Sequence, residues 1–240
     1  MAKRNKNEAR RQKPAYQREQ QVNIYHLPTT FHVLPKNWKQ ELLIAAIKSN
    51  VMVATHGCAG TGKTYCGVGT AAQLFMKGKY KKVVLTRAYV HVGKTLGMKP
   101  GDITAKMTPM LMPMLEVLKK AFGKGKYEYL ISKEQIELQP LEDVRGRSYE
   151  DALILVDEAQ NLTMEELKAL STRIGENSKM IFMGDPAQSD LRKDGSDFKR
   201  FCELCEKNGV PLPVIEFGVE DIVRSDIVAD LVKMFMKEGL

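Results

Sequence analysis

Residues 57–64 form a glycine-rich stretch whose spacing suits phosphate binding. The stretch, Gly57-Cys58-Ala59-Gly60-Thr61-Gly62-Lys63-Thr64, matches the pattern G-x-x-x-x-G-K-[ST]. Its glycines permit a tight turn whose backbone N–H groups converge on phosphate oxygens, and a following helix adds partial positive charge at its N-terminus. We expect Lys63 to contact the β- and γ-phosphates and the Thr64 hydroxyl to bind Mg²⁺. Tyr65, the next residue, is assigned to the same nucleotide site. The alternative interpretation of residues 57–64 is a glycine-rich turn that binds no ligand.

Two adjacent acids, Asp157 and Glu158, follow the apolar run 153–156. Ligands of open α/β sheets bind at the carboxyl ends of the strands, so both side chains are predicted to face the nucleotide. Because Mg²⁺ favours carboxylates and retains waters, we expect Asp157 to hold the ion through water. Glu158 is expected to orient or deprotonate the attacking water. Two acids after a strand can also cap a helix, and their pairing with residues 57–64 favours the catalytic interpretation.

A third apolar run ends in the sequence 184–188, Gly-Asp-Pro-Ala-Gln. We expect Gln188 to sense the γ-phosphate and Asp185 to support the water or the metal. Taken alone, Gly-Asp-Pro is a common turn. The assignment of these residues to the site therefore depends on the two preceding motifs.

Short apolar runs alternate with helix-compatible segments from Pro35 onward, and these elements must position the motifs. Nearly continuous apolar runs are typical of parallel strands that helices cover on both faces. The predicted strands are 51–54, 83–85, 152–156, 180–183 and 214–217. The predicted helices are roughly 37–49, 63–77, 106–121, 164–173, 196–207 and 225–237. The alternation predicts an α/β fold with an open, mostly parallel sheet.

The chain divides into a basic tail over 1–21 and one α/β domain over 22–240. The tail has seven basic and two acidic residues, and the whole chain has a net charge of +8. Such a tail is expected to be flexible and either to attract phosphate backbones or merely to aid solubility. Within the domain, 93–149 is less regular, with a predicted hairpin around 127–139. We expect this stretch to be an insertion beside the sheet.

The composition restricts the class of protein. Hydrophobic residues make up 43% and charged residues 28%, which provides a core and excludes a wholly disordered chain. No apolar run approaches the roughly 18 residues of a membrane helix, so no membrane span is predicted. Four cysteines are too few for a secreted disulfide framework and favour the cytoplasm. Cys202 and Cys205 form half of a zinc pattern, but their helical segment favours buried thiols.

The motifs together resemble those of the PhoH family of ATPases, which is related to superfamily 1 helicases. The resemblance rests on 157–161 (DEAQN) and 184–188 (GDPAQ) and spans about 35–235. Further matches are Thr86-Arg87, 93–102 (GKTLGMKPGD), 106–113, 140–148 (PLEDVRGRS), 172–175 (TRIG) and 221–224 (DIVR). The resemblance implies a RecA-like P-loop ATPase core, ATP and Mg²⁺ as ligands, coupling to RNA or single-stranded nucleic acid, helicase activity and ring-shaped oligomers. It also assigns Gln160 and Asp185 to the nucleotide site.

Gln40 matches the upstream glutamine that reads adenine in the related helicases, 17 residues before Gly57. A glutamine amide both donates to and accepts from the adenine edge, whereas guanine would mismatch. The chain has no [NT]KxD guanine-reading motif, which supports ATP over GTP. A surface glutamine on an amphipathic helix is the alternative.

One phosphate loop and one acidic strand end indicate a single RecA-like lobe. In two-lobed helicases the second lobe contributes an arginine, and such an arginine can be worth about 10³–10⁵ in rate. We expect a neighbouring subunit to supply it in a head-to-tail ring, taken to be a hexamer. The candidates are Arg145, Arg147, Arg173 and Arg224. Arg224 is suited to an interface, whereas Arg147 could instead belong to the site of its own chain.

The predicted function is ATP hydrolysis with Mg²⁺ in an oligomer coupled to RNA. With the basic tail, four residues are candidates for a groove that binds single-stranded nucleic acid: Arg87, Tyr89, Lys94 and Lys99. Ordinary surface basicity is the alternative for that groove. The competing function is a nucleotide-gated switch of shape or assembly without unwinding. A kinase is disfavoured, because Glu-Ala-Gln after Asp157 suits activation of water.

Overall fold

The computed structural model describes residues 31–88, 103–188 and 196–238. The predicted tail over 1–21 lies outside these ranges. Tyr89, Lys94 and Lys99 of the predicted nucleic-acid groove lie outside them as well.

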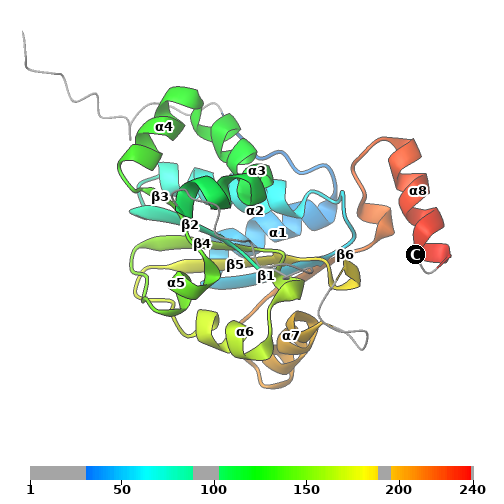
Figure 1. Ribbon diagram of the computed structural model, residues 1–240. Coiled ribbons are helices and arrows are strands. Elements are labelled where there is room, and N and C mark those ends of the chain that lie inside the picture. Colours follow the sequence, from blue (N-terminus) through cyan, green and yellow to red (C-terminus); the bar gives the residue numbers. More distant parts are fainter. Residues whose placement is uncertain (1–30, 89–102, 189–195, 239–240) are drawn as a thin grey trace, which may run out of the picture.

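A six-stranded parallel sheet forms the centre of the fold (Figure 1). Its strands are β1 (Met52–Gly57), β2 (Lys82–Arg87), β3 (Ile136–Leu138), β4 (Ala152–Asp157), β5 (Lys179–Gly184) and β6 (Val214–Phe217). They lie in the order β3-β2-β4-β5-β1-β6, and every pair of neighbours runs parallel. The predicted parallel α/β sheet is therefore confirmed, and all five predicted strands are present.

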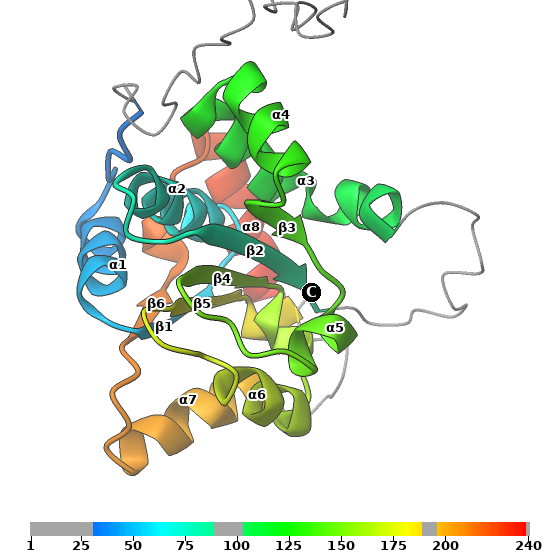
Figure 2. The same ribbon diagram turned by 90° about the vertical axis from the view of Figure 1, so that its left-hand side faces the viewer.

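Helices cover both faces of the sheet, as predicted (Figure 2). One layer contains α1 (Trp38–Ser49), α2 (Lys63–Met76), α3 (Ile103–Phe122) and α4 (Lys124–Ser132), and the other contains α5 (Leu141–Arg145), α6 (Met164–Ser171) and α7 (Asp197–Lys207). Successive strand side chains point to opposite faces. In β4, Leu153 and Leu155 accordingly enter the first core, while Ile154 and Val156 enter the second. Burial on both faces accounts for the nearly continuous apolar runs.

The stretch after Ile103 differs from the prediction. A hairpin was expected around 127–139, but α4 covers the first part of it and β3 pairs parallel with β2. The hairpin is therefore wrong. Tyr127 and Leu130 are buried three residues apart on α4, which is helical rather than strand spacing. The described part of 93–149 thus adds an edge strand to the sheet instead of lying only beside it.

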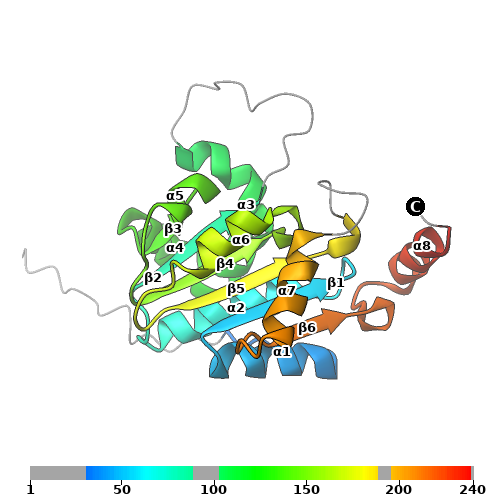
Figure 3. The same cartoon turned by 90° about the horizontal axis from the view of Figure 1, so that it is seen from below.

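The carboxyl ends of four adjacent strands meet at one edge of the sheet (Figure 3). β1 ends in the glycine-rich loop that leads into α2, and β4 ends at Asp157. β5 ends at Gly184, just before a short 3₁₀ turn, η4 (Pro186–Gln188). β2 ends at Arg87, in register with Asp157. The fold thereby brings all three predicted motifs to the edge where open α/β sheets bind ligands.

The last helix, α8 (Asp226–Lys237), extends away from the sheet and its two helical layers (Figures 1 and 3). It follows a short 3₁₀ turn, η5 (Val219–Asp221). None of its described side chains is buried. Among the helices of the described ranges, none combines the length and the apolar character needed to cross a bilayer.

Candidate nucleotide-binding site

Residues 57–64, the phosphate loop, connect β1 to α2 through three glycines with positive φ. The φ angles are 126° at Gly57, 82° at Gly60 and 84° at Gly62, a region that L side chains rarely adopt. At Gly57 an added Cβ would lie 1.9 Å from the carbonyl oxygen of Phe217 in β6. The loop therefore needs glycine there both for its backbone angle and for the close approach of β6.

Lys63, the first residue of α2, lies folded against the loop. Its Nζ donates hydrogen bonds to the carbonyl oxygens of Gly57 and Cys58, both at 2.7 Å. Burial lowers the pKa of Lys63, and the carboxylate of Asp185 acts in the opposite direction. A phosphate oxygen would therefore be a strong new partner for this partly desolvated ammonium group.

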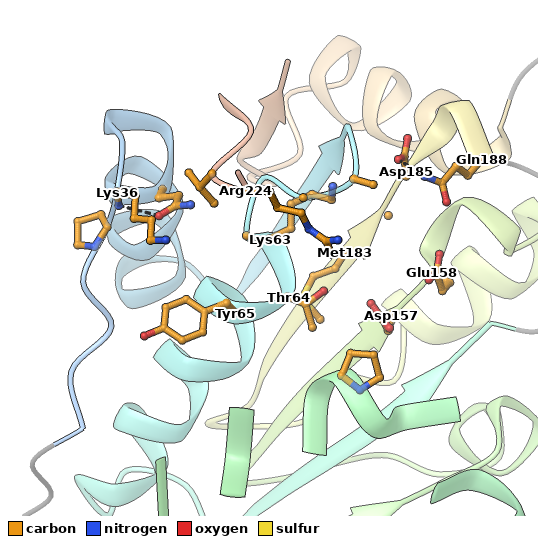
Figure 4. A pocket seen from close by; sticks show the side chains of 18 of the residues that line it. Lys36, Lys63, Thr64, Tyr65, Asp157, Glu158, Met183, Asp185, Gln188 and Arg224 are labelled. Atoms are coloured by element: carbon orange, nitrogen blue, oxygen red, sulfur yellow. Dashed lines mark hydrogen bonds between the residues drawn. The ribbon is translucent and has the colours of Figure 1, made fainter. Parts of the chain in front are cut away.

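A pocket of about 850 Å³ adjoins the loop (Figure 4). The predicted site residues that line it are Gln40, Ala59, Gly60, Gly62, Lys63, Thr64, Tyr65, Asp157, Glu158, Asp185, Gln188 and Arg224. The pocket is also lined by residues that were not predicted as site residues: Leu34, Pro35, Lys36, Pro113, Met183, Gly184 and Val223. Of these, Pro113, Gly184 and Val223 belong to the stretches that carry the family resemblance, whereas Leu34, Pro35, Lys36 and Met183 lie outside them.

Asp157 and Thr64 are the candidate ligands of a divalent cation, and both line the pocket (Figure 4). Burial raises the pKa of Asp157 to about 6, the neighbouring Glu158 carboxylate adds to this, and Arg87 opposes it. A carboxylate and a hydroxyl are the oxygen donors that Mg²⁺ prefers. Because burial disfavours the charge on Asp157, a cation beside it would restore the ionised form. The residues present therefore fit Mg²⁺.

Glu158 has both carboxylate oxygens engaged by other side chains. Its backbone is left-handed, with φ 51°. Oε1 accepts from Nη2 of Arg87 at 2.7 Å, and Oε2 accepts from Nε2 of Gln160 at 2.6 Å. These two donors fix the orientation of the predicted general base.

Arg87 contacts both acids at the end of β4. Its Nη1 lies 3.3 Å from Oδ2 of Asp157 and also donates to the carbonyl oxygen of Met110 in α3 at 2.9 Å. The sequence predicts a place for Arg87 in a nucleic-acid groove, and the structure shows in addition that it contacts two carboxylates of the candidate nucleotide site. Sequence patterns missed this pairing because it depends on β2 and β4 being neighbours, which only the strand order determines.

Gln160 lies behind the pocket and joins two of its motifs. It is buried in the 3₁₀ turn η3 (Ala159–Asn161), where its Oε1 accepts from the backbone N–H of Asp185 at 2.9 Å. Asp185 in turn accepts from Nε2 of Gln188 at 2.9 Å. Burial raises the pKa of Asp185, and Lys63 opposes this. Gln160 thus contacts the pocket residues Glu158 and Asp185 without lining the pocket itself.

Gln40 is buried between α1 and the phosphate loop. Its Nε2 donates to the carbonyl oxygen of Thr61 at 2.8 Å, and its Oε1 accepts from the N–H of Lys36 at 2.8 Å. The alternative of a surface glutamine is therefore wrong. Leu34 and Tyr65 line the same pocket and supply apolar surface.

The candidate arginines lie in different places. Arg224 lines the pocket of its own chain, where its side chain would lie 3.2 Å from a Cβ added to Gly60. Arg147 does not line the pocket: it lies 3.5 Å from Glu137 and over the ring of Tyr149. The structure thus places Arg147 outside the pocket of its own chain. Arg173 lies near Arg147, because its carbonyl oxygen accepts a hydrogen bond from the backbone N–H of Tyr149, over whose ring Arg147 lies.

The paired cysteines are core residues. Cys202 and Cys205 are both buried in α7 and pack in the second core, as predicted. Burial raises the pKa of Cys202 to about 12. Over 31–88, 103–188 and 196–238, no group of three or more His, Cys, Asp or Glu side chains is arranged to hold a metal ion.

The parallel sheet, the phosphate loop and the acidic strand end together define the fold of a P-loop ATPase. A family model described as PhoH-like protein matches residues 32–236. The chain belongs to this PhoH-like family.

Relatives of known sequence agree with this membership. The chain is 37% identical over 204 residues to a PhoH-like protein of Bacillus subtilis, covering 85% of this chain and 64% of that protein. It is 34% identical over 199 residues to Protein PhoH of Escherichia coli, covering 82% of this chain and 56% of that protein. The chain therefore spans less than two thirds of the length of these relatives.

A solved structure shares the fold at low sequence identity. The large terminase from a thermophilic bacteriophage matches with a TM-score of 0.54 and 11% identity, covering 83% of this chain and 50% of the terminase. At this identity the likeness concerns the arrangement of the sheet and helices alone.

Proposed function

We propose that the protein binds ATP with Mg²⁺ and hydrolyses it, and that it works as an oligomeric ATPase coupled to RNA or single-stranded nucleic acid. One observation carries the proposal. A single pocket is lined by the phosphate loop, by Asp157 and Glu158 of β4 and by Asp185 and Gln188 after β5. This combination supplies anion binding, metal binding and a base at the edge of a parallel sheet.

Binding of the triphosphate begins with Lys63 and the loop amides. Lys63 would exchange the carbonyl oxygens of Gly57 and Cys58 for phosphate oxygens, while the loop N–H groups and the N-terminus of α2 bind the same anion. Thr64 and Asp157 would hold Mg²⁺, which when bound neutralises charge developing on the phosphate oxygens. Gln40, beside the apolar surface of Leu34 and Tyr65, is proposed to recognise adenine.

In the chemical step, Glu158 would accept a proton from water. The water oxygen forms a bond to the γ-phosphorus as the bond from phosphorus to the bridging oxygen breaks, and ADP leaves with that electron pair. The proton passes from Glu158 to the released phosphate. Asp185 is hydrogen-bonded to Gln188, so both side chains are suited to respond to the γ-phosphate.

Two substitutions test the ATPase proposal in the full chain. Lys63→Ala should abolish phosphate release, because it removes the cation nearest the phosphate loop. Glu158→Gln should still bind an ATP analogue yet hydrolyse ATP at least about 10²-fold more slowly, the usual scale for loss of a general base. Lys77→Ala, an exposed lysine that follows α2, is the matched control and should keep full turnover. Undiminished hydrolysis in either pocket variant would remove that residue from its role.

Coupling to nucleic acid is tested by measuring phosphate release with and without single-stranded RNA. Stimulation by RNA supports a motor, and indifference to RNA supports a switch. Loss of ATP without free phosphate would indicate transfer to another acceptor, as in a kinase. One feature of the site favours the switch: both carboxylate oxygens of Glu158 have protein partners.

Assembly into a ring is supported by the exposed apolar face of α8. Ile227, Leu231, Met234 and Phe235 recur at helical spacing on this helix and are all exposed. Val223 and Arg224, just before α8, line the pocket, so a second copy of this chain seated on α8 would lie next to the nucleotide. We propose that the second copy supplies an arginine in a hexameric ring, with Arg145, Arg147 and Arg173 as candidates and Arg224 serving its own chain.

A further inference from the structure

Arg87 lies beside the pocket and contacts two of its acids. The reaction proposed above gives Arg87 no role. Within the described ranges its guanidinium makes three polar contacts: with Glu158 at 2.7 Å, with Asp157 at 3.3 Å and with the carbonyl of Met110 at 2.9 Å. The two carboxylates are those proposed to activate water and to hold the cation. Arg87 is therefore the counter-ion of both acids in this structure.

This pairing keeps Glu158 turned toward the protein. Arg87 donates a charge-assisted bond to one carboxylate oxygen, and Gln160 donates to the other at 2.6 Å. A water molecule that is to give its proton to Glu158 has to share or displace one of these donors. Of the two donors, Gln160 is buried and also bonded to Asp185, while the Arg87 side chain is 26% exposed. Arg87 is thus the donor that can move.

The binding of a cation at Asp157 favours such a movement. Asp157 would then share its charge with the cation, and the positive guanidinium would face a second positive charge nearby. Arg87 would keep Glu158 as its main anionic partner at the edge of the sheet. A planar guanidinium fork matches a phosphate group as well as it matches a carboxylate, so a phosphodiester can compete with Glu158 for it.

We propose that Arg87 is a positioning residue that holds Glu158 in a resting orientation, and that phosphodiester groups of single-stranded RNA draw Arg87 away so that Glu158 can turn to the attacking water. This inference rests on the proposed ATPase function. In this proposal the ion pair between Arg87 and Glu158 couples RNA binding to ATP hydrolysis.

The first test measures RNA binding and requires no ATP turnover. Fluorescence anisotropy of a labelled oligouridine, titrated with the full chain without nucleotide, compares wild type, Arg87→Ala, Glu158→Gln and the double variant. If Glu158 competes with RNA for Arg87, Glu158→Gln should tighten binding about tenfold when Arg87 is present. In the Arg87→Ala background the same change should alter binding less than about twofold. Equal tightening in both backgrounds would reflect removal of a negative charge alone and would overturn the proposal.

The second test measures phosphate release with saturating ATP, with and without oligouridine. Arg87→Ala should raise basal kcat about tenfold and reduce RNA stimulation to less than about twofold, because Glu158 is already released. Arg87→Lys, which keeps the charge but not the fork, should fall between wild type and Arg87→Ala. Arg200→Ala, which removes an exposed arginine of α7, controls for the loss of one positive charge and should match wild type.

The outcomes separate this inference from the ATPase proposal. A lower basal kcat in Arg87→Ala, with ATP-analogue binding retained, would mean that Arg87 aligns an active Glu158, and the resting role would be wrong. An unchanged basal kcat would also overturn it, as would a wild-type chain that does not bind oligouridine. A wild type without ATP turnover would contradict the ATPase proposal, while the binding cycle would still decide whether Arg87 and Glu158 compete for RNA.

Discussion

Asp157 is a buried acid whose negative charge is disfavoured by its surroundings. Its pKa of about 6 lies above the ordinary value of 3.8, first because of burial and then because of Glu158. Between about pH 4 and pH 6 the folded state therefore binds more protons at this residue than the unfolded state does. The free energy of unfolding must fall as the pH rises through this window.

Replacing Asp157 with Asn should remove that pH dependence. Without Mg²⁺ and nucleotide at pH 7, Asp157→Asn should unfold with a free energy up to about 3 kcal/mol higher than wild type. The difference should shrink as the pH is lowered toward 4, because the wild-type carboxyl is then protonated in the folded state and no buried charge remains. Denaturant unfolding curves at several pH values measure this, and a difference that does not vary with pH would contradict the assigned pKa.

The sequence predicted the chemical groups of the site better than their partners. Lys63 and Thr64 follow from a motif whose spacing is dictated by phosphate geometry, and Asp157 follows from its place after an apolar strand. The pairing of Arg87 with Glu158 has no such local signature, since 71 positions separate the two residues. It exists because β2 lies next to β4, a long-range feature that side-chain periodicity does not encode.

At the scale of elements, the phosphate loop depends on how closely β6 approaches the end of β1. Gly57 should not tolerate alanine, because its φ of 126° is strained for an L residue and the new Cβ would collide with the Phe217 carbonyl. We expect Gly57→Ala to lower the free energy of unfolding by at least about 2 kcal/mol and to weaken ATP-analogue binding.

Gly78→Ala provides the matched control for that prediction. Gly78 also has a positive φ, 72°, but an added Cβ would meet no atom within 4 Å. Its loss of stability should be about 1 kcal/mol, the cost of the left-handed backbone alone, with nucleotide binding unchanged. Equal effects of the two substitutions in thermal and denaturant unfolding would show that the contact with β6 is unimportant.

Helices and strands with strong periodicity were predictable, and the short edge elements were not. The helix around 63–77 and the strands around β4 and β5 have apolar patterns set by burial on both sides. β3 has only three residues, and its one fully buried side chain is Ile136. Such a strand is too short to show an alternation of apolar and polar residues. The preceding helix α4 has no clearly separated apolar and polar faces. The stretch was therefore mistaken for a hairpin.

At the scale of the whole molecule, α8 is the element that its own chain does not bury. Most apolar residues of the sheet and of α1 to α7 face two continuous cores, whereas the described side chains of α8 remain exposed or half-exposed. An apolar helix face of this kind normally indicates an interaction surface. Its place in the sequence, shortly after the pocket residues Val223 and Arg224, would link the proposed assembly to the nucleotide site.

Leu231→Asp should therefore disrupt the proposed ring. A charge in the middle of the α8 face would have to be buried without a partner at the interface between copies, which is strongly unfavourable. Multi-angle light scattering should show a ring for wild type and a monomer for Leu231→Asp, with ATP turnover reduced because no neighbour supplies an arginine. Leu204→Asp on α7 is the control, since Leu204 is 40% exposed and Leu231 is 42% exposed. If the two variants retain the wild-type mass, α8 is not the interface; if wild type itself is monomeric and fully active, the ring and the arginine in trans are both wrong.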